Sequence, residues 1–279
     1  MSNQKITFIG SGAMAEAMIV GLLREKLAKP ENLFASDPRE DRGEELREEY
    51  GILPFTDNLA AVKDADVVVL SIKPQRLSPV LEELKGSIPE KALVLSIIAG
   101  ATIDKISTGL GHDKVVRTMP NTPARIGEGI TVWVASDAVS DQQKEQAKKM
   151  LSALGEDVFV EDEYYLDMAT ALSGTGPAYV YMFMEAMIDA GVHMGFPRRI
   201  SEKLVVQTMR GSVNFYEKND LHVAALRNQV TSSGGTSAEA LYYLEKAGVR
   251  TAISRAIWAA YQRSLELGRE KKEHVPKDQ

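Results

Sequence analysis

The sequence predicts an α/β protein in which an N-terminal, doubly wound parallel sheet is followed by an all-helical region. In the first half, short runs rich in Val and Ile alternate with amphipathic stretches, which indicates βαβ units. The runs do not alternate in polarity, as is typical of strands covered on both faces. After about residue 161 these runs disappear and the segments have helical spacing. We therefore expect two domains, residues 1–162 and 163–279.

The strands are expected where short apolar runs lie between turn-forming residues. These are residues 5–9, 33–36, 52–55, 67–72, 93–97, 115–119, 131–134 and 158–160. Helices are expected between them where apolar residues recur at helical spacing. These are residues 14–25, 41–49, 79–85 and 142–154. Right-handed crossovers then make the sheet parallel.

The second half is expected to form helices separated by glycine-containing breaks. They are residues 164–172, 177–194, 200–218, 222–230, 236–247 and 249–267. The helix that begins at Pro177 has apolar residues on nearly every side, which is typical of burial in a core or in a subunit interface. A helical domain of this size has little room to bury it alone, so oligomerisation is favoured over a core position. The charged tail from Arg269 is expected to be a frayed, solvated end.

The composition excludes several kinds of chemistry. With no cysteine, the chain can form neither a disulfide framework nor a Cys-ligated metal site nor a thiol nucleophile. The 4 histidines are scattered, so no metal site is expected, and the net charge of −6 argues against nucleic-acid binding. The longest near-apolar run, 92–101, is too short to span a bilayer and no targeting segment is visible. We therefore expect a cytoplasmic protein that works with hydroxyls, backbone dipoles, a few charges or a bound cofactor, without membrane contact.

A glycine-rich turn follows the first expected strand and opens the first helix. Its residues are Gly10, Ser11, Gly12, Ala13, Met14 and Ala15, in the pattern G-x-G-x-x-A. Gly10 permits the tight turn, Gly12 lets the backbone approach a pyrophosphate, and Ala15 lets the helix pack closely on the sheet. The pyrophosphate would lie at the positive N-terminus of the helix. Between a strand and a helix, this pattern predicts a Rossmann-like dinucleotide-binding domain rather than an incidental turn.

The second strand ends at Ser36, where the adenosine ribose of a dinucleotide is expected. An acidic residue at this end accepts the ribose 2′-OH and is typical of NAD, whereas a nearby arginine accommodates the 2′-phosphate of NADP. Asp37 favours the first, and Arg39 with Arg42 favours the second. The sequence leaves the choice between NADH and NADPH open.

Three further strand ends carry small or polar residues, at 71–75, 96–100 and 119–123. Lys73 supplies a cation beside the glycine-rich turn, and two prolines hold Asn121 in a stiff turn. Because ligands of open α/β sheets bind outside the carboxyl ends of the strands, we expect a ligand site here. Ordinary turns are the alternative.

The stretch 229–239 is the most unusual of the helical half. Hydroxyl residues surround Gly234 and Gly235 just before an expected helix. Exposed backbone N–H groups, hydroxyls and a helix N-terminus together predict a nest for a carboxylate. A capping box from Thr236 to Glu239 is the alternative. The loop 172–178 at the start of the apolar helix is a second candidate.

Together these motifs resemble those of the pyrroline-5-carboxylate reductases. The blocks that carry the resemblance are 10–15, 73–74, 96–100, 119–123, 173–179 and 231–237, and the likeness extends from about residue 5 to 267. It implies a Rossmann-like sheet followed by an all-α C-terminal dimerisation domain. It also implies hydride transfer from NADPH or NADH to the C=N bond of 1-pyrroline-5-carboxylate, which gives L-proline. Dimers with interlocked helical domains, assembled into a larger ring such as a decamer, would follow.

By position, the resemblance implies the site residues. Cofactor contacts fall on Gly10, Ser11, Gly12, Ala13, Met14, Ala15, Ser36, Asp37, Asn58, Ser71, Lys73, Pro74, Ala99, Gly100 and Asn121. Substrate contacts fall on Gly176, Pro177, Thr231, Ser232, Gly234, Gly235, Thr236 and Ser237. Ser237 stands where a hydroxyl faces the ring nitrogen. As an alcohol is a poor acid, we expect it to position the nitrogen or to relay a proton through water.

The chain departs from the family pattern at two places. The family usually has Ser-Pro-Gly-Gly-Thr-Thr where residues 232–237 are Ser-Ser-Gly-Gly-Thr-Ser, which softens the loop at Ser233 and keeps the hydroxyl at Ser237. Asp37 stands where many members have a small polar residue. The alternatives are a reductase of a related cyclic imine and a non-catalytic dinucleotide-binding paralogue. A relative of the β-hydroxyacid dehydrogenases is less favoured, because Lys203 and Lys218 lack the context of that class's catalytic lysine.

Overall fold

The computed structural model describes residues 3–268. The described residues divide into two compact units: one holds residues 3–175 and 260–268, and the other holds Gly176–Ala259. The first unit thus continues past residue 162. The expected domain boundary between residues 162 and 163 stays a prediction. The expectation of a frayed tail concerns residues 269–279, which lie outside the described residues.

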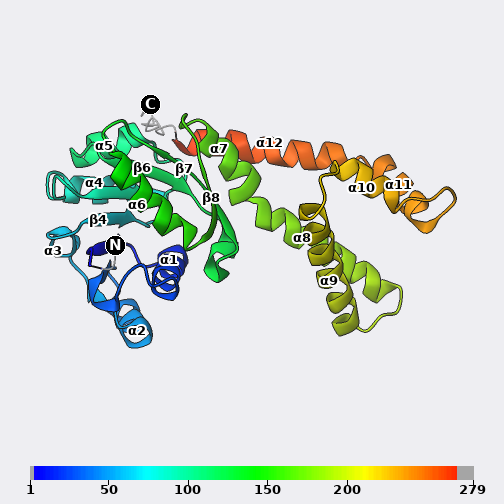
Figure 1. Cartoon of the computed structure of the whole chain (residues 1–279), viewed down its shortest axis with the longest axis horizontal. Coiled ribbons are helices and arrows are strands. Elements are labelled where there is room, and N and C mark those ends of the chain that lie inside the picture. Colours follow the sequence, from blue (N-terminus) through cyan, green and yellow to red (C-terminus); the bar gives the residue numbers. More distant parts are fainter. Residues whose placement is uncertain (1–2, 269–279) are drawn as a thin grey trace, which may run out of the picture. The chain divides into compact units, whose positions relative to one another are not determined.

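An eight-stranded sheet forms the first unit, in the order β3-β2-β1-β4-β5-β6-β7-β8 (Figure 1). The strands are β1 (Ile6–Ile9), β2 (Leu33–Ser36), β3 (Leu53–Phe55), β4 (Val67–Leu70), β5 (Leu93–Ser96), β6 (Val115–Met119), β7 (Gly129–Ala135) and β8 (Gly155–Phe159). From β3 across to β6 all pairs are parallel. β2 and β4 lie on opposite sides of β1, so the strand order reverses there. The predicted doubly wound α/β fold is confirmed.

The last two strands depart from the expected parallel arrangement. β7 pairs antiparallel with β6, and β8 pairs parallel with β7. Between β6 and β7 lies only a short 3-10 helix, η3 (Thr122–Ile126). Parallel pairing needs a crossover of about a dozen residues or more, which this connection cannot supply. The expectation of an all-parallel sheet is therefore wrong at this edge.

Helices cover both faces of the sheet. They are α1 (Ala13–Arg24), α2 (Glu40–Tyr50), α3 (Asn58–Val62), α4 (Leu77–Leu84), α5 (Ile103–Leu110), α6 (Asp141–Ser152) and α7 (Tyr165–Ala169), with 3-10 helices η1 (Pro30–Asn32) and η2 (Pro74–Arg76) and the π-helical turn η4 (Thr170–Gly174). In β4, Val67 and Val69 pack in one apolar cluster with residues of α1, and Val68 and Leu70 pack in another with residues of α4. Two buried faces explain why the strand sequences do not alternate in polarity.

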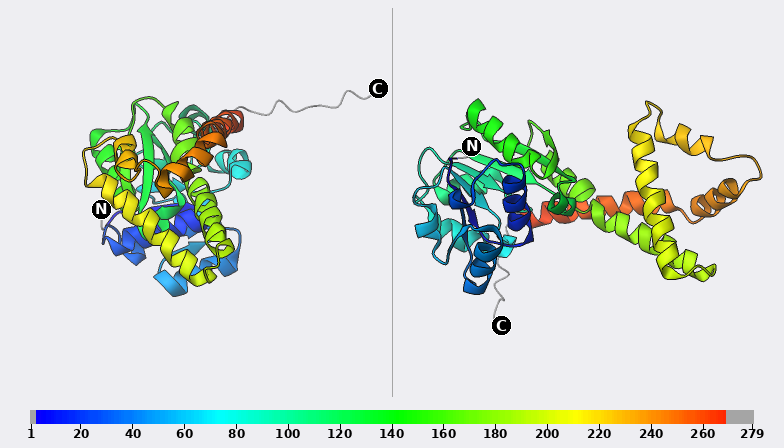
Figure 2. Two further views of the ribbon diagram at one scale, coloured as in Figure 1. Left: turned by 90° about the vertical axis from the view of Figure 1, so that its right-hand side faces the viewer. Right: turned by 60° about the horizontal axis from the view of Figure 1, so that its bottom comes forward.

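The second unit contains only helices. They are α8 (Gly176–His193), α9 (Arg198–Glu217), α10 (Val223–Gln229), α11 (Thr236–Lys246) and the first part of α12 (Val249–Gly268), and within the unit they form an open arrangement (Figure 2). α8 packs on α9, where the Ser201 hydroxyl donates to the Ile188 carbonyl at 2.8 Å. Gly191 is the buried residue of α8, so a position in the core of one chain is wrong for this apolar helix. The interface alternative stays a prediction.

No helix among residues 3–268 combines the length and the apolar character that crossing a membrane would take.

Candidate functional site

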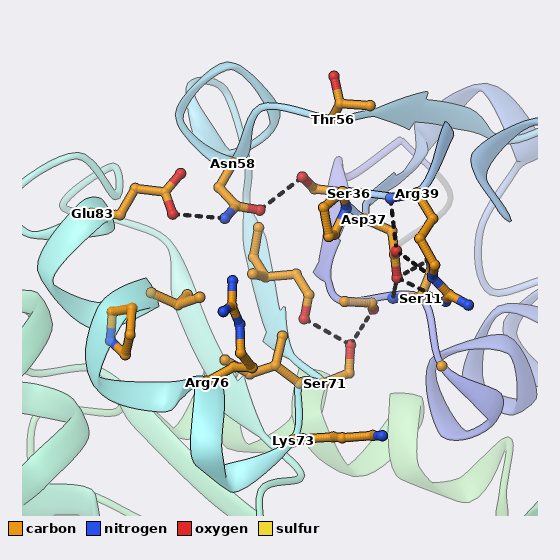
Figure 3. A pocket seen from close by; sticks show the side chains of 17 residues that line it. Ser11, Ser36, Asp37, Arg39, Thr56, Asn58, Ser71, Lys73, Arg76 and Glu83 are labelled. Atoms are coloured by element: carbon orange, nitrogen blue, oxygen red, sulfur yellow. Dashed lines mark hydrogen bonds and ion pairs between the residues drawn. The ribbon is translucent and has the colours of Figure 1, made fainter. Parts of the chain in front are cut away.

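A cavity of about 400 Å³ opens at the carboxyl ends of β1, β2 and β4, where the strand order reverses (Figure 3). Of the expected cofactor residues, those that line it are Gly10, Ser11, Gly12, Ser36, Asp37, Asn58, Ser71 and Lys73. Parallel strands bring their carboxyl ends to the same edge, which explains how such distant segments meet. We name this cavity the dinucleotide cleft.

The glycine-rich turn forms the floor of the dinucleotide cleft. Gly10 has φ +91°, and a Cβ there would lie 2.8 Å from the Ser71 carbonyl oxygen, so only glycine fits. The Gly10 N–H donates to the Ser36 carbonyl at 2.8 Å, and the Ser71 hydroxyl donates to the Gly10 carbonyl at 2.6 Å. These bonds connect the ends of β1, β2 and β4.

Gly12 is the N-cap of α1 and has an ordinary extended conformation, with φ −72°. A Cβ on Gly12 would meet nothing within 4 Å, and no side chain caps the helix. The first N–H groups of α1 therefore have no side-chain acceptor, and a Cβ on Gly12 would take space beside them that a bound group could fill. This arrangement suits a pyrophosphate, since the helix N-terminus attracts anions.

Asp37 lies at the end of β2 and is bonded from two sides. Ser11 donates to its Oδ2 through both the backbone N–H, at 3.2 Å, and the hydroxyl, at 2.9 Å. Arg39 donates to its Oδ1 through the backbone N–H, at 3.1 Å, and the side-chain Nε, at 3.0 Å. Although burial raises the pKa of Asp37, the hydrogen bonds from Arg39 and Ser11 outweigh that effect and lower it to about 2. The carboxylate is therefore ionised at neutral pH.

Arg42, which the sequence offered as a ligand for the 2′-phosphate of NADP, is instead bonded within the fold. Its Nε donates to the Ser11 carbonyl at 3.0 Å, and its guanidinium pairs with Glu16 and Glu45. Glu16 also accepts from the Tyr50 hydroxyl at 2.9 Å. Burial raises the pKa of Glu16, but Arg42 and Tyr50 more than compensate and hold it below its usual value. Arg42 thus holds the glycine-rich turn, and Arg39 is the arginine of this pair that lines the dinucleotide cleft.

The far wall of the dinucleotide cleft contains residues that the sequence analysis missed. Ser36 donates its hydroxyl to Asn58 Oδ1 at 2.7 Å, and Asn58 Nδ2 donates to Glu83 Oε2 at 2.9 Å (Figure 3). Further lining residues that were not predicted are Thr56, Arg76, Pro79, Val80 and Glu83. Arg76, at the end of η2, and Pro79, Val80 and Glu83 on α4 recur at helical spacing. That spacing could have indicated one lining face directly after the expected ligand Lys73.

The other predicted cofactor residues do not line the cleft. Ala13, Met14 and Ala15 belong to α1, Pro74 begins η2, and Ala99 and Gly100 follow β5. Asn121 uses its amide within the fold: its Oδ1 accepts from the Ile130 N–H at 3.0 Å and its Nδ2 donates to the Ser173 carbonyl at 3.2 Å. It thereby ties the end of β6 to the π-helical turn η4, and its cofactor contact stays a prediction.

The hydroxyl-rich loop leads into α11, whose first residues are Thr236 and Ser237. Its N-cap is Gly235, and no side chain caps the helix. The capping box from Thr236 is therefore wrong, because Thr236 already lies inside the helix. Gly234 takes φ +69°, and the Thr231 hydroxyl is occupied by the Arg227 carbonyl at 2.7 Å. The N-terminus of α11 thus presents N–H groups without a side-chain acceptor.

Gly176 and Pro177 begin α8, directly after η4. These two residues and the loop 231–237 belong to the second unit, and the dinucleotide cleft belongs to the first. Their assignment to one substrate site stays a prediction. Across residues 3–268, no group of three or more His, Asp or Glu side chains is placed to hold a metal ion.

Two family models match the chain. Residues 163–267 match pyrroline-5-carboxylate reductase dimerisation, and residues 5–100 match NADP oxidoreductase, coenzyme F420-dependent. A curated pyrroline-5-carboxylate reductase from Synechocystis sp. is 40% identical over 265 residues, which cover 95% of this chain and 98% of the relative.

Solved structures give the same result over the whole fold. Plasmodium falciparum pyrroline carboxylate reductase with NADP bound is 33% identical, with a TM-score of 0.89, and the match covers 96% of this chain and 100% of that one. A pyrroline-5-carboxylate reductase from Coxiella burnetii is 35% identical, with a TM-score of 0.87 and the same coverage. The resemblance seen in the motifs is confirmed, and the chain belongs to the pyrroline-5-carboxylate reductase family.

Proposed function

We propose that the chain is an NAD(P)H-dependent oxidoreductase that reduces the C=N bond of 1-pyrroline-5-carboxylate to give L-proline. The observation that carries the proposal is the uncapped N-terminus of α1 in a cleft at the switch point of the sheet, in a chain of this family. Bound NADH or NADPH supplies the hydride. The residues of the chain bind the cofactor and the substrate, orient them toward each other, and exclude water from between them.

The dinucleotide cleft offers a distinct group to each part of the cofactor. Gly12 and the N-terminus of α1 suit the pyrophosphate, and the Ser36–Asn58 pair with Asp37 suits the adenosine ribose. Lys73, at the end of β4, would face the phosphates or the nicotinamide half. The further cofactor contacts implied for residues 99, 100 and 121 remain part of this proposal.

The substrate is an anion with an electrophilic C=N bond. Its carboxylate suits the uncapped N-terminus of α11 with Thr236, and the Ser237 hydroxyl would hold the ring nitrogen. The imine carbon receives the hydride and the nitrogen carries the proton, so that the amine of proline results. No nucleophile is required, and orientation of two partners can contribute up to about 7–11 kcal/mol to the barrier.

A serine pair in one loop tests this assignment. Ser237→Ala should lower turnover about tenfold or more and leave dinucleotide affinity nearly unchanged, because the lost hydroxyl is proposed to contact the substrate and not the dinucleotide. Ser233→Ala, in the same loop, is the matched control and should keep turnover. Equal turnover in Ser237→Ala and the unaltered protein would remove the role of this hydroxyl.

The oxidation of NADPH and NADH with pyrroline-5-carboxylate, followed by absorbance, distinguishes the alternatives. Turnover with either cofactor eliminates the non-catalytic paralogue. Turnover only with the six-membered homologue of the substrate would favour a related cyclic imine.

The oligomeric state is inferred from the helices of the second unit. The matched dimerisation model and the exposed apolar side chains of α8 support a homodimer, and a larger ring such as a decamer is the further proposal. Sedimentation velocity on the full chain measures both. A cytoplasmic location stays a prediction from the sequence.

A further inference from the structure

We propose that Asp37 makes the dinucleotide cleft select NADH over NADPH, and that Arg39 does not offset its charge. The inference rests on the proposed function only in that a nicotinamide dinucleotide binds there. It concerns the choice that the sequence left open, and it depends on which groups surround the end of β2.

Asp37 is held in place independently of Arg39. Both donors of Ser11 contact its Oδ2, and its backbone N–H donates to the Phe55 carbonyl at 3.1 Å. The side chain is only 11% exposed. The carboxylate therefore cannot turn away from a ligand at the end of β2, and its negative charge is a fixed feature of the cleft.

The Arg39 side chain, by contrast, bonds to Asp37 from the solvent side and is 61% exposed, so a ligand could displace it without opening the core. If its guanidinium swings into solvent, Asp37 Oδ1 keeps only the Arg39 backbone N–H and gains room for another donor. A ribose 2′-OH is such a donor, and a hydrogen bond to a carboxylate is stronger than one to a neutral acceptor. NADH can thus replace the bonds of the arginine side chain.

A 2′-phosphate at the same place would bind less favourably than a 2′-OH. It carries a charge of about −1.5 to −2 and has only acceptor oxygens, so it repels the fixed Asp37 carboxylate. Arg39 would have to serve both anions, and its charge is already balanced by Asp37. Arg42, the other candidate, is held by Glu16, Glu45 and the Ser11 carbonyl.

The remaining cations of the cleft lie elsewhere. Lys73 and Arg76 line it from the end of β4 and from η2, apart from the Asp37–Arg39 pair (Figure 3). Glu83 adds a negative charge to that wall. Around Asp37, the described residues therefore favour a hydroxyl over a phosphate.

Fluorescence titration of the full chain with NADH and with NADPH, without imine, tests the proposal. The unaltered protein should bind NADH about tenfold more tightly or better, the size expected from a charged hydrogen bond. Asp37→Asn should weaken NADH, strengthen NADPH and so reverse the ratio. Arg39→Ala should weaken NADPH further and retain NADH. Glu40→Gln removes one charge from the same exposed segment outside the cleft, and should leave the ratio unchanged.

Tighter binding of NADPH than of NADH by the unaltered protein would overturn the proposal, and so would an unchanged ratio in a folded Asp37→Asn variant. Circular dichroism of that variant establishes the folding. Normal NADH binding without imine reduction would contradict the proposed function alone. Failure to bind either dinucleotide would contradict both.

Discussion

The two compact units bury their apolar side chains to very different degrees. The sheet unit encloses two clusters of buried residues, one on each face of the strands. In the helical unit, the buried residues of α8 and α9 are only Gly191, Ser201 and Val205. Tyr181, Met182, Val213 and Phe215 on the same two helices are exposed. The sheet unit thus has a complete core, and the helical unit has an apolar surface that needs a partner.

This difference separates two requirements of a reductase within one chain. Cofactor binding depends on a unit with its own core, and it should survive changes elsewhere. Substrate binding is proposed for helices whose apolar surface a second copy would cover. Substitutions in one unit should therefore leave the property that belongs to the other intact.

The largest effect is expected from a charge in the apolar surface of the helical unit. Met182 on α8 is 62% exposed, and Met182→Glu would bury an unpaired carboxylate if a second copy packs on this surface. We expect the dimer dissociation constant to rise about a hundredfold or more, as a cost of several kcal/mol implies, with a parallel loss of imine reduction. Sedimentation velocity and turnover measure the two.

The matched control is Asp220→Asn, which also changes one charge, in the exposed connection between α9 and α10. It should keep the dimer. NADH affinity should be unchanged in both variants, because the dinucleotide cleft lies in the sheet unit. A monomeric Met182→Glu variant with full turnover would break the link between assembly and substrate binding.

The next largest effect belongs to the sheet unit and separates binding from folding. Gly12→Val puts a side chain into open space at the N-terminus of α1, at a φ of −72° that valine adopts. We expect NADH affinity to fall about a hundredfold while the melting temperature stays the same, because only the bound pyrophosphate meets the new side chain.

Gly10→Ala is the companion variant, and we expect it to reduce the stability of the fold rather than to block the pyrophosphate. Its Cβ would lie 2.8 Å from the Ser71 carbonyl oxygen, at a φ of +91°. We expect a loss of about 1–3 kcal/mol in the free energy of unfolding. A Gly12→Val variant that is destabilised as much as Gly10→Ala would show that the space at Gly12 is needed by the fold.

A third prediction uses the pH dependence of unfolding. Asp37 has a pKa of about 2 in the folded chain against 3.8 ordinarily, so its contribution is complete above pH 3.8 and is lost as the pH falls through 2. This contribution is about 2 kcal/mol. Urea unfolding should show unaltered protein more stable than Asp37→Asn by that amount at pH 6, and by about half of it at pH 3. A difference independent of pH would assign the loss to packing.

Local sequence patterns predicted much of this fold, but not the parts that depend on distant residues. Buried strands such as Val67–Leu70 stand out as apolar runs. The helix Ile103–Leu110 was missed because Ile, Ser, Thr and Gly are weak helix formers, although Thr102 caps it and Gly111 ends it. The direction of β7 depends on the length of a connection, which an apolar run does not indicate.

The site shows the same division. Gly10, Gly12 and Asp37 line the cleft as predicted, because a turn and the end of a strand, which the sequence indicates, place them there. The pairing of side chains was not predictable. In the sequence, Arg39 and Arg42 are equally plausible phosphate ligands, and only the fold shows that Arg42 forms an ion pair with Glu16. Glu83 was missed for the same reason, because its partner Asn58 lies 25 residues away.

Glu83 gives the smallest predicted effect, and it tests whether the wall of the cleft is preorganised. The carboxylate accepts from Asn58 Nδ2 at 2.9 Å, and Asn58 in turn accepts from the Ser36 hydroxyl. Glu83→Ala should weaken NADH binding only about threefold, because Asn58 loses one of its two supports and keeps its bond to Ser36.

Glu83→Gln retains an acceptor oxygen and should recover most of that affinity, whereas Glu82→Ala, its neighbour outside the cleft, should change nothing. Comparison of the alanine and glutamine variants separates positioning from charge. If both weaken NADH equally, the carboxylate acts through its charge. If neither does, Ser36 alone holds Asn58, and the ribose wall needs no support from α4.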